Sequence, residues 1–576
     1  MKNLGKYLKR NIWYIIIGPF FKLLEAISEL LNPILVAKII DNVVNGPDTY
    51  YIVKIGLTII AVNIIAIIFS ILGQKCSAIA STRVGTDMRT DLFEKISSFS
   101  HAELDKFGTA TLINRIINDT AQVEAAVGMF MRNILRVPLL LIGAFVISLI
   151  KNPKMSFVFL ALIPIVSVIL YFFMKKTSPY SKKIRTKLDN ISRVTKENLD
   201  GTRVIRAFNK QEAEIERFTE VADDYTVTNI KVTKISSMLE PLIFLIVDLA
   251  VAGLLAIGGW QVNIGGMSQG DVIALIDYVG MITTSLLLMS HIIVTFVRTI
   301  ASLHRIDEIN NTIPAVQDAG NAKYYRKLKY ENLMEFENVS FNYSGNKDEK
   351  SFIKDLSFVI KPGQTIGIIG GTGSGKTTIA SLMTRFYDAT QGRVLYKGKD
   401  IKEFSLKQIR KEISIVQQRS LLFSGSLRQN MQIRDLKAKD EEIINALKIS
   451  QAWSFVDEWP QKLDYQIMAG GKNVSGGQMQ RLTIARALIG NPEMIILDDS
   501  SSALDFLTDS NLRHDLKTLN STLVFISQRA TSIKAADLII VLDNGDVVGM
   551  GKHADLMKNC EIYKEPDGRR PASGTD

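Results

Sequence analysis

Residues 370–378 read GGTGSGKTT, a glycine-rich loop that ends in a lysine and two threonines. They satisfy G-x-x-x-x-G-K-[ST] directly after the apolar segment 365–369 and before a stretch of helical pattern. Glycines let successive backbone N–H groups face phosphate oxygens, Lys376 can reach the β- and γ-phosphates, and the Thr377 hydroxyl can hold Mg²⁺. The pattern predicts a nucleotide phosphate site made by Gly370, Gly371, Thr372, Gly373, Ser374, Gly375, Lys376, Thr377 and Thr378.

A second apolar segment, MIILDD at 494–499, ends in two acids. A carboxylate at the end of such a strand can complete the Mg²⁺ shell, and Asp498 fits that role. An apolar strand that ends in Asp is more often only a turn cap or a solvated charge. The order of the two motifs along the chain is what favours a metal-nucleotide site.

Between these motifs, residues 474–488 read VSGGQMQRLTIARAL. Here the chain resembles the ATP-binding cassette (ABC) transporter family, whose signature is LSGGQ, with Val474 as the one changed position. A serine and two glycines at a helix start form another anion site. The resemblance implies that this site closes over the γ-phosphate of ATP held by the opposite subunit, so ATP is expected between two such domains. The signature residues are Ser475, Gly476, Gly477 and Gln478.

Three further residues carry roles only through this resemblance. Tyr343 in FNY is similar to the aromatic residue that stacks on adenine, and Gln418 in VQQRSLLF to the Q-loop glutamine, which also approaches Mg²⁺. SALD at 502–505 resembles the D-loop, which ends in Asp505.

Segments 31–41, 205–209 and 301–309 resemble the corresponding segments of exporter-type half-transporters. The resemblance implies that helical tips, here near 99–110 and 203–213, dock on ATP-binding domains.

The catalytic positions depart from the family pattern. Asp499 stands where a hydrolytic cassette has a glutamate that positions water, and Gln528 replaces the switch histidine. Ala469 stands where exporters usually carry glutamate. Misplacing a catalytic carboxylate by about 1 Å can reduce the rate on the order of a hundredfold. An intact phosphate loop beside two altered catalytic positions indicates a site that binds ATP and hydrolyses it poorly.

This pattern resembles the degenerate-site subunit of heterodimeric bacterial multidrug exporters. The resemblance implies a second, non-identical half-transporter, whose competent site would use the intact signature of this chain. The expected activity is outward movement of amphipathic drugs, lipids or peptides across the cytoplasmic membrane. Two alternatives remain open: a homodimeric exporter in which Asp499 is a slow base, and an ATP-binding membrane regulator that transports nothing.

The elements around these motifs differ between the two halves of the chain. Up to about residue 300 the apolar stretches approach the roughly 20 residues that cross a bilayer, and later ones do not. The charges Lys22, Glu25 and Glu29 interrupt the first of them, and Lys22 and Glu25 are expected to pair. The expected spans are 12–40, 52–72, 134–150, 155–174, 239–257 and 272–297.

Basic residues place both termini and the long segments 75–132 and 175–238 on the cytoplasmic side, although Lys151 and Lys154 depart from that rule. The net charge of +11 is then explained by the inner membrane face, and no nucleic-acid partner is expected. Asp248, alone in an apolar run, is expected either to line a cavity or to pair. Cys76 and Cys560 are too far apart to indicate a disulfide framework or a zinc site.

The expected fold is an α-helical membrane domain with six exporter-type spans, fused to an α/β P-loop nucleotide-binding domain. The expected boundaries are 1–306 for the membrane domain, 307–335 for a linker and 336–565 for the nucleotide-binding domain. Residues 566–576, rich in Pro, Gly and Ser, are expected to be a disordered tail.

Overall fold

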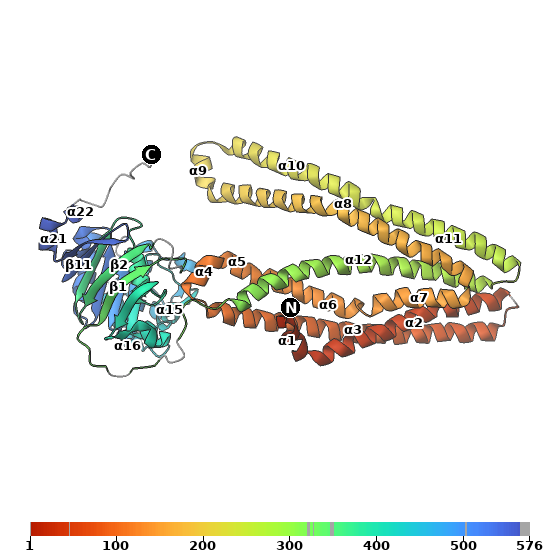
Figure 1. Cartoon of the computed structure of the whole chain (residues 1–576), viewed down its shortest axis with the longest axis horizontal. Coiled ribbons are helices and arrows are strands. Elements are labelled where there is room, and N and C mark those ends of the chain that lie inside the picture. Colours follow the sequence, from red (N-terminus) through yellow and green to blue (C-terminus); the bar gives the residue numbers. More distant parts are fainter. Residues whose placement is uncertain are drawn as a thin grey trace. The chain divides into compact units, whose positions relative to one another are not determined.

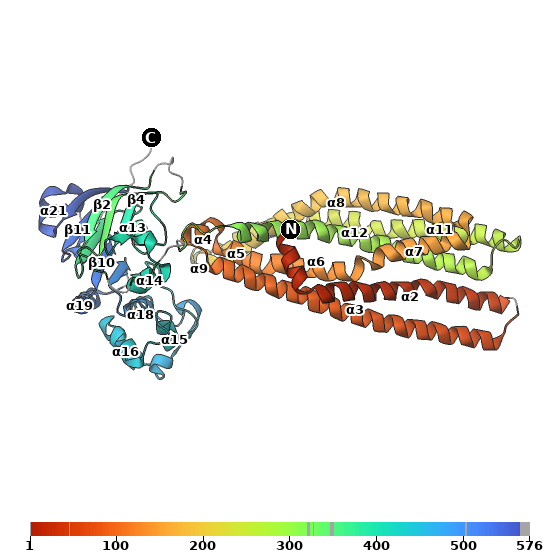
Figure 2. The same cartoon turned by 60° about the horizontal axis from the view of Figure 1, so that its bottom comes forward.

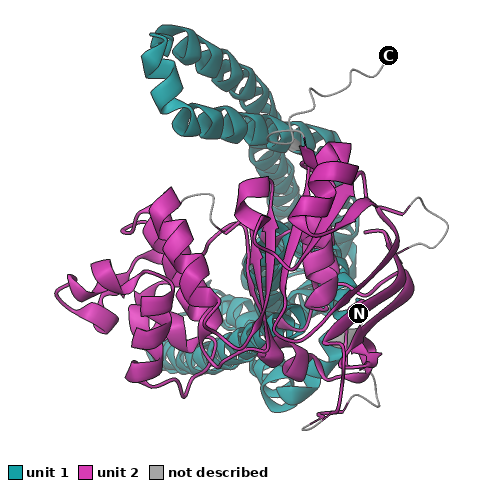
Figure 3. Ribbon diagram, turned by 90° about the vertical axis from the view of Figure 1, so that its left-hand side faces the viewer, with its two compact units in different colours: residues 1–96, 110–312 teal, residues 97–109, 313–576 magenta. Residues whose placement is uncertain are grey.

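The computed structural model describes residues 2–44, 46–318, 323–325, 328–345, 351–500 and 504–564. The chain forms two compact units, which Figure 3 shows in different colours. The helical unit comprises Met1–Ile96 and Ala110–Thr312, and the α/β unit comprises Ser97–Thr109 and Ile313–Asp576. A short segment from the first half of the sequence thus belongs to the unit formed by the second half.

The helical unit consists of long helices joined by short turns, as the red-to-green ribbons of Figure 1 show. A short amphipathic helix precedes the first long one. The helices are α1 (Lys2–Arg10), α2 (Ile12–Val44), α3 (Thr49–Ser97), α5 (Thr109–Asn114), the π-helix η1 (Arg115–Asp119), α6 (Thr120–Asn133), α7 (Arg136–Lys151), α8 (Pro153–Asp200), α9 (Thr202–Ala207), α10 (Gln211–Ser237), α11 (Leu239–Asn263) and α12 (Gln269–Asn311).

Several helices of this unit have the length and composition of membrane spans. Among the described residues, five helical stretches are long and apolar enough to cross a membrane: Thr49–Ser97, Thr109–Lys151, Pro153–Asp200, Gln211–Asn263 and Gln269–Asn311. The helix α2 is not in that set because charged residues interrupt it, but its 33 residues extend about 50 Å at 1.5 Å per residue. The helices α3 and α8 have 49 and 48 residues, so they are much longer than the roughly 20 residues that cross a bilayer.

The charges inside α2 are paired with neighbours. Lys22 Nζ lies 2.6 Å from Glu25 Oε2, and Arg136 Nη2 of α7 lies 2.6 Å from Glu29 Oε1. The predicted pairing of Lys22 with Glu25 is confirmed. A buried charge without a partner would destabilise the unit by about 3–5 kcal/mol, which the pairing avoids.

At the other end of the bundle Lys151 pairs with Asp271 at 2.6 Å, which neutralises one of the two lysines that depart from the topology rule. Asp248 of α11 is exposed, and no ion pair between described residues includes it.

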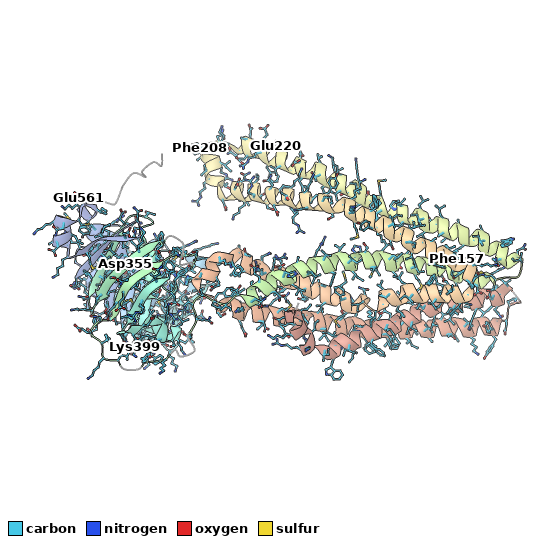
Figure 4. All side chains as sticks on the ribbon, viewed as in Figure 1. Phe157, Phe208, Glu220, Asp355, Lys399 and Glu561 are labelled. Atoms are coloured by element: carbon cyan, nitrogen blue, oxygen red, sulfur yellow. The ribbon has the colours of Figure 1, made fainter. Side chains whose placement is uncertain are left out.

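A long hairpin is formed by α8 on one side and by α10 and α11 on the other (Figure 1). The short helix α9 lies at its end, where the sequence predicts a helical tip, and none of its residues is buried. Phe208, directly after α9, has 72% of its surface exposed and projects from the tip in Figure 4.

The α/β unit contains a six-stranded sheet with strand order β12-β11-β3-β10-β9-β6, in which β11, β3, β10, β9 and β6 are parallel. A second, antiparallel sheet has the order β2-β1-β4-β5, and β7 pairs with β8. The strands are β1 (Met334–Phe341), β2 (Ile353–Ile360), β3 (Thr365–Gly370), β4 (Gln391–Tyr396), β5 (Lys399–Asp400), β6 (Ile413–Val416), β7 (Gly425–Ser426), β8 (Gln466–Ile467), β9 (Met494–Asp498), β10 (Thr522–Ser527), β11 (Leu538–Asp543) and β12 (Asp546–Gly551).

Two hydrophobic cores hold this unit together, one on each face of the six-stranded sheet. Side chains alternate along a strand, so Ile495 and Leu497 of β9 enter one core while Met494 and Ile496 enter the other. The first core is closed by α18, α16 and α19, and the second by α13 and the antiparallel sheet.

The helices of the α/β unit, seen from a second side in Figure 2, are mostly short. They are α4 (His101–Phe107), α13 (Lys376–Met383), α14 (Leu406–Glu412), α15 (Leu427–Gln432), α16 (Asp440–Ile449), α17 (Trp453–Asp457), α18 (Gly476–Leu488), α19 (Phe506–Leu516), α20 (Ala530–Ile533), α21 (His553–Asn559) and α22 (Glu561–Lys564), with 3₁₀-helices η2 (Ile401–Glu403), η3 (Lys462–Asp464) and η4 (Ala469–Gly471).

The element boundaries differ slightly from the expected domain limits. The helix α12 continues to Asn311, five residues past the expected end of the membrane domain, and β1 begins at Met334 rather than 336. The helix continues because its C-terminal part is held by packing, with Ile306 and Ile309 buried. The expected disordered tail at 566–576 lies outside the described residues.

Candidate nucleotide-binding site

The carboxyl ends of four adjacent parallel strands form the site. In the order β3, β10, β9 and β6, these ends carry the phosphate loop, Gln528, the pair Asp498–Asp499, and Gln418. Backbone pairing aligns Ile526 of β10 with Asp498 of β9, so the strands end at the same level. The end of an open parallel sheet is where such folds bind ligands, because the loops there can diverge and leave a crevice.

The phosphate loop has the geometry that its glycines permit. Gly375 has φ 101°, a left-handed conformation that side chains rarely adopt, and a Cβ there would lie 2.3 Å from Ile353 Cδ1. A Cβ on Gly370 would lie 2.3 Å from the carbonyl oxygen of Leu542. The helix α13 begins immediately after Gly375, so its free N–H groups and its dipole are directed at the loop.

Lys376 lies over this loop. Its Nζ donates to the carbonyl oxygens of Gly370 and Gly371 at 2.8 and 2.5 Å. Burial lowers the pKa of Lys376, and the charges of Asp498 and Asp499 oppose that shift. The ammonium is therefore held beside the N–H groups that would bind phosphate oxygens.

Thr377 and Asp498 form a hydroxyl–carboxylate pair at the predicted metal position. Asp498 is only 3% exposed, and a hydrogen bond from Thr377 stabilises its carboxylate. Burial raises the pKa of Asp498, with Thr377 and Lys376 acting in the opposite direction. Hard oxygen ligands beside a phosphate site fit Mg²⁺, which binds proteins through one or two carboxylates together with substrate phosphates.

No group of three or more His, Cys, Asp and Glu side chains among the described residues could hold a metal ion. A site of the Mg²⁺–nucleotide type does not need one, because the phosphates supply part of the shell.

Asp499 is brought together with Gln418 by a hydrogen bond between their side chains. Burial raises the pKa of Asp499, and the charges of Lys376 and Arg529 oppose the shift. The sequence interpretation missed Arg529, although it directly follows the switch position. Gln528 itself is exposed at the end of β10, on the same edge of the sheet.

Tyr343 lies beside the phosphate helix, as a base-stacking residue would. Its hydroxyl is 2.6 Å from Thr378 Oγ1, and its ring is 54% exposed. The edge-to-face rings of Phe341 and Tyr387 support it at centroid distances of 5.0 and 5.5 Å. A fixed ring with a free face can stack on adenine.

The signature residues lie at the start of α18, apart from the phosphate loop. Figure 2 shows α18 grouped with α15 and α16, away from α13. Ser475 is the N-cap of α18: its hydroxyl accepts from Gln478 N at 3.2 Å, while Gln478 Oε1 accepts from Ser475 N at 2.9 Å. Ser475 and Gly476 are exposed, so this helix start is open to a ligand from outside the chain's own phosphate loop.

The remaining predicted positions are also at element ends. Asp505 caps α19 by accepting from Thr508 N at 3.0 Å, and hydrogen bonds from the side chain and then the N–H of Thr508 lower the pKa of Asp505. Ser502 and Ala503 of the predicted D-loop lie outside the described residues. Ala469 is exposed at the start of η4.

A contact of the α/β unit involves the helix α4, which the sequence interpretation placed among the docking tips. The ring of His101 stacks on Phe386 at 4.2 Å, and the hydroxyl of Tyr387 donates to Asp105. Burial lowers the pKa of His101, whereas burial and Asp105 together raise that of Tyr387. Sequence reasoning missed Phe386 and Tyr387, because only packing shows that they meet α4.

Comparisons with known proteins agree with this architecture. Residues 15–286 match the model of the ABC transporter transmembrane region, and residues 353–502 match the ABC transporter model. An uncharacterized ABC transporter ATP-binding protein of Bacillus subtilis, YfiB, is 32% identical over 94% of each chain. The ATP-dependent lipid A-core flippase of Pseudomonas aeruginosa is 31% identical, over 90% of this chain and 85% of the relative.

A solved structure shares the fold. The structure of a bacterial Atm1-family ABC exporter with ATP bound has a TM-score of 0.79 and covers 99% of both chains at 23% identity. The helical unit corresponds to the transmembrane region and the α/β unit to the ATP-binding domain. The chain therefore belongs to the ABC transporter family, as an exporter-type half-transporter with a membrane domain fused to an ATP-binding domain.

Proposed function

We propose that this chain is one subunit of a heterodimeric, ATP-driven exporter that moves amphipathic compounds outward across the cytoplasmic membrane. Its own phosphate loop holds ATP and Mg²⁺ and turns the nucleotide over slowly. Its signature completes the hydrolytic site of a second, non-identical half-transporter. Both termini and the ATP-binding domain lie in the cytoplasm.

One observation carries the proposal: an intact phosphate cradle stands beside altered catalytic positions. The contact of Lys376 with the phosphate loop and the hydrogen bond from Thr377 to Asp498 support nucleotide binding. At position 499 the carboxylate is one methylene shorter than glutamate and is already hydrogen-bonded by Gln418. A carboxylate that must polarise water needs to reach within hydrogen-bond distance of it, and a short, engaged one does so poorly.

The position of the signature supports a second subunit. Ser475 and Gly476 are exposed at a helix start that lies apart from the chain's own loop. A helix N-terminus with a serine and two glycines is an anion site, and a γ-phosphate bound to another chain is the ligand it fits. For the transported compound, the relative named a lipid A-core flippase favours a lipid-like amphiphile.

The test is a trapped-nucleotide assay on the complex isolated from its native membrane. ATP is added with Mg²⁺, and the nucleotide bound to this chain is identified by photo-crosslinking after several turnovers. We expect ATP at this chain and ADP at its partner. ADP at this chain, with no second half-transporter copurifying, would instead indicate a homodimer in which Asp499 is a competent base.

A further inference from the structure

A row of polar side chains runs along one face of α12. Asp277, Thr284, His291 and Arg298 follow one another at intervals of seven residues, and all four are exposed. Seven residues of an α-helix advance by about 10.5 Å and return to nearly the same direction, with a drift of about 20°. These four residues, the α12 stripe, therefore extend for about 30 Å along one side of the helix, close to the thickness of a bilayer core.

The opposite face of α12 packs into the helical unit. Leu275, Tyr278 and Ile282 are fully buried, and Tyr278 Oη donates to the carbonyl oxygen of Leu30 in α2 at 2.8 Å. This packing fixes the rotation of α12 about its axis. The stripe consequently points away from the helices that α12 contacts.

The charged side chains of the α12 stripe form no ion pairs within the described part of the chain. No ion pair between described residues includes Asp277, His291 or Arg298, whereas Arg305, about two turns further along α12, pairs with Asp119. The Thr284 hydroxyl donates a hydrogen bond to the carbonyl oxygen of Gly280, one turn earlier in the same helix, at 3.0 Å. Polar groups in a span are costly in lipid and almost always face water or protein, so this face is not a lipid-facing one.

The charges change sign along the stripe. With both termini in the cytoplasm, the turn between α11 and α12 lies on the outer side, so Asp277 is near the outer end and Arg298 near the inner end. A guanidinium can bind a phosphate or carboxylate through two parallel hydrogen bonds, and His291 and Thr284 offer further donors along the row. A carboxylate at the outer end repels the same anionic group.

We propose that the α12 stripe lines the transport path and selects lipid-like amphiphiles with an anionic headgroup. The headgroup binds Arg298 and His291 from the cytoplasmic side and is released past Asp277. This inference rests on the proposed exporter function and adds the substrate class to it. A phosphate and a carboxylate headgroup share the required chemistry.

The first test asks whether the stripe faces water. Thr284→Cys is introduced into a Cys76→Ser, Cys560→Ala background, and reaction with a membrane-impermeant cationic thiol reagent is followed in native membrane vesicles opened to both sides. Ile67→Cys, on the exposed apolar face of α3, is the matched control. We expect Thr284→Cys to react at least tenfold faster. Equal, slow reaction at both positions would overturn the proposal, because lipid or a partner chain would then cover the stripe.

The second test measures selectivity. The complex, with whatever chain copurifies, is placed in phosphatidylcholine vesicles that contain a trace of fluorescent phosphatidylglycerol or of phosphatidylcholine with the same acyl chains. We expect ATP-driven movement to favour the anionic probe. Arg298→Glu should reduce that preference about tenfold, the effect of losing one strong charge-assisted contact, and Arg298→Lys should retain part of it.

Controls separate this inference from the proposed function. Lys54→Glu makes the same change in net charge on α3, and ATP hydrolysis is measured without probe for every variant. If the native complex hydrolyses ATP but neither probe moves, or if Arg298→Glu and Lys54→Glu behave alike, the stripe is not the selector and the exporter function stands. If Arg298→Glu fails to assemble, His291→Glu is measured for the same loss of preference.

Discussion

At position 499 the backbone and the side chain both favour aspartate over the glutamate of hydrolytic relatives. The residue has φ 47°, in the left-handed region that Asp tolerates better than longer side chains. Its N–H donates to the carbonyl oxygen of Ile526 at 2.9 Å, which fixes that conformation, and Gln418 holds the carboxylate. The Asp499 carboxylate is therefore held in one position and does not extend toward the place where a γ-phosphate would bind.

The double variant Asp499→Glu, Gln528→His should restore a water-positioning carboxylate and a switch imidazole. We expect the ATP retained at this chain to be converted to ADP, while overall ATPase rises only modestly because catalytic groups act as a unit. The measurement is the trapped nucleotide in native and repaired complexes. Asp499→Asn with Gln528→His is the control, and conversion to ADP in that control would show that position 499 is not the base.

At Tyr343 the ring and the hydroxyl can be separated by mutation. Tyr343→Ala should weaken ATP binding by about tenfold or more, because aromatic stacking contributes about 1–3 kcal/mol per base. Tyr343→Phe keeps the ring, loses only the contact to Thr378, and should bind nearly as well. Competition with a fluorescent nucleotide on the purified chain measures both. Equal losses in the two variants would assign the effect to the hydrogen bond.

Two helix starts are the elements to which the proposal assigns phosphate binding. The start of α13 directs its N–H groups at the chain's own phosphate loop, whereas the start of α18 is capped by Ser475 and remains exposed. Both use the same helix-dipole physics on phosphate groups. Their separation within one chain is the physical basis for the proposal that two chains enclose a nucleotide.

A bulky acidic side chain at the start of α18 should disable the complex but not this chain's own ATP binding. In Gly476→Glu the added carboxylate repels the γ-phosphate of the partner's ATP, and we expect the ATPase of the complex to fall on the order of a hundredfold. Gly476→Ala is the small control. Nucleotide binding and hydrolysis are measured on the same preparations, and unchanged hydrolysis in Gly476→Glu would argue against an ATP shared between chains.

The contact between α4 and the strand-and-helix core is the second element with a testable role. Asp105→Asn weakens the charge-assisted hydrogen bond from Tyr387, whose ring also supports Tyr343 beside the nucleotide. We expect ATP affinity to stay within about twofold and stimulation of ATPase by a transported compound to decrease severalfold. Lys106→Gln, on the same helix, is the control. A parallel loss of affinity would show that the contact only stabilises the fold.

At the scale of the whole molecule, the chain is a half-transporter. The helical unit has the apolar spans, and the α/β unit has one phosphate loop and one signature that do not meet. At the tip of the α8–α10 hairpin, no residue of α9 is buried, and Phe208 directly after it is exposed.

Purified alone, the chain should bind ATP with Mg²⁺ and hydrolyse it slowly. The expected rate is well below the roughly 1–100 s⁻¹ of typical phosphoryl-transfer enzymes, because its own site lacks both the glutamate and a partner's signature. Addition of the second half-transporter should raise it at least tenfold. Brisk turnover by the single chain, with sedimentation showing a homodimer, would contradict the heterodimer.

The sequence by itself determined the phosphate loop, the signature motif, the aspartate proposed as a metal ligand and the apolar spans. Each of these features depends on residues that are close in the sequence. Gly375 must be glycine because its backbone is left-handed where the loop leads into α13. A run of about 20 apolar residues is long enough to cross a bilayer. The pairing of Lys22 with Glu25 was predictable for the same reason, since residues three apart share one helix face.

Only the tertiary structure decided which distant segments meet. The contacts of Gln418 with Asp499 and of Thr377 with Asp498, and the placement of α4 on Phe386 and Tyr387, depend on how strands and helices far apart in the sequence pack together. The heptad spacing of Asp277, Thr284, His291 and Arg298 was present in the sequence, but spacing alone does not say which face of a helix is buried. Packing of Tyr278 against α2 fixed the rotation of α12, and that rotation left the polar face exposed.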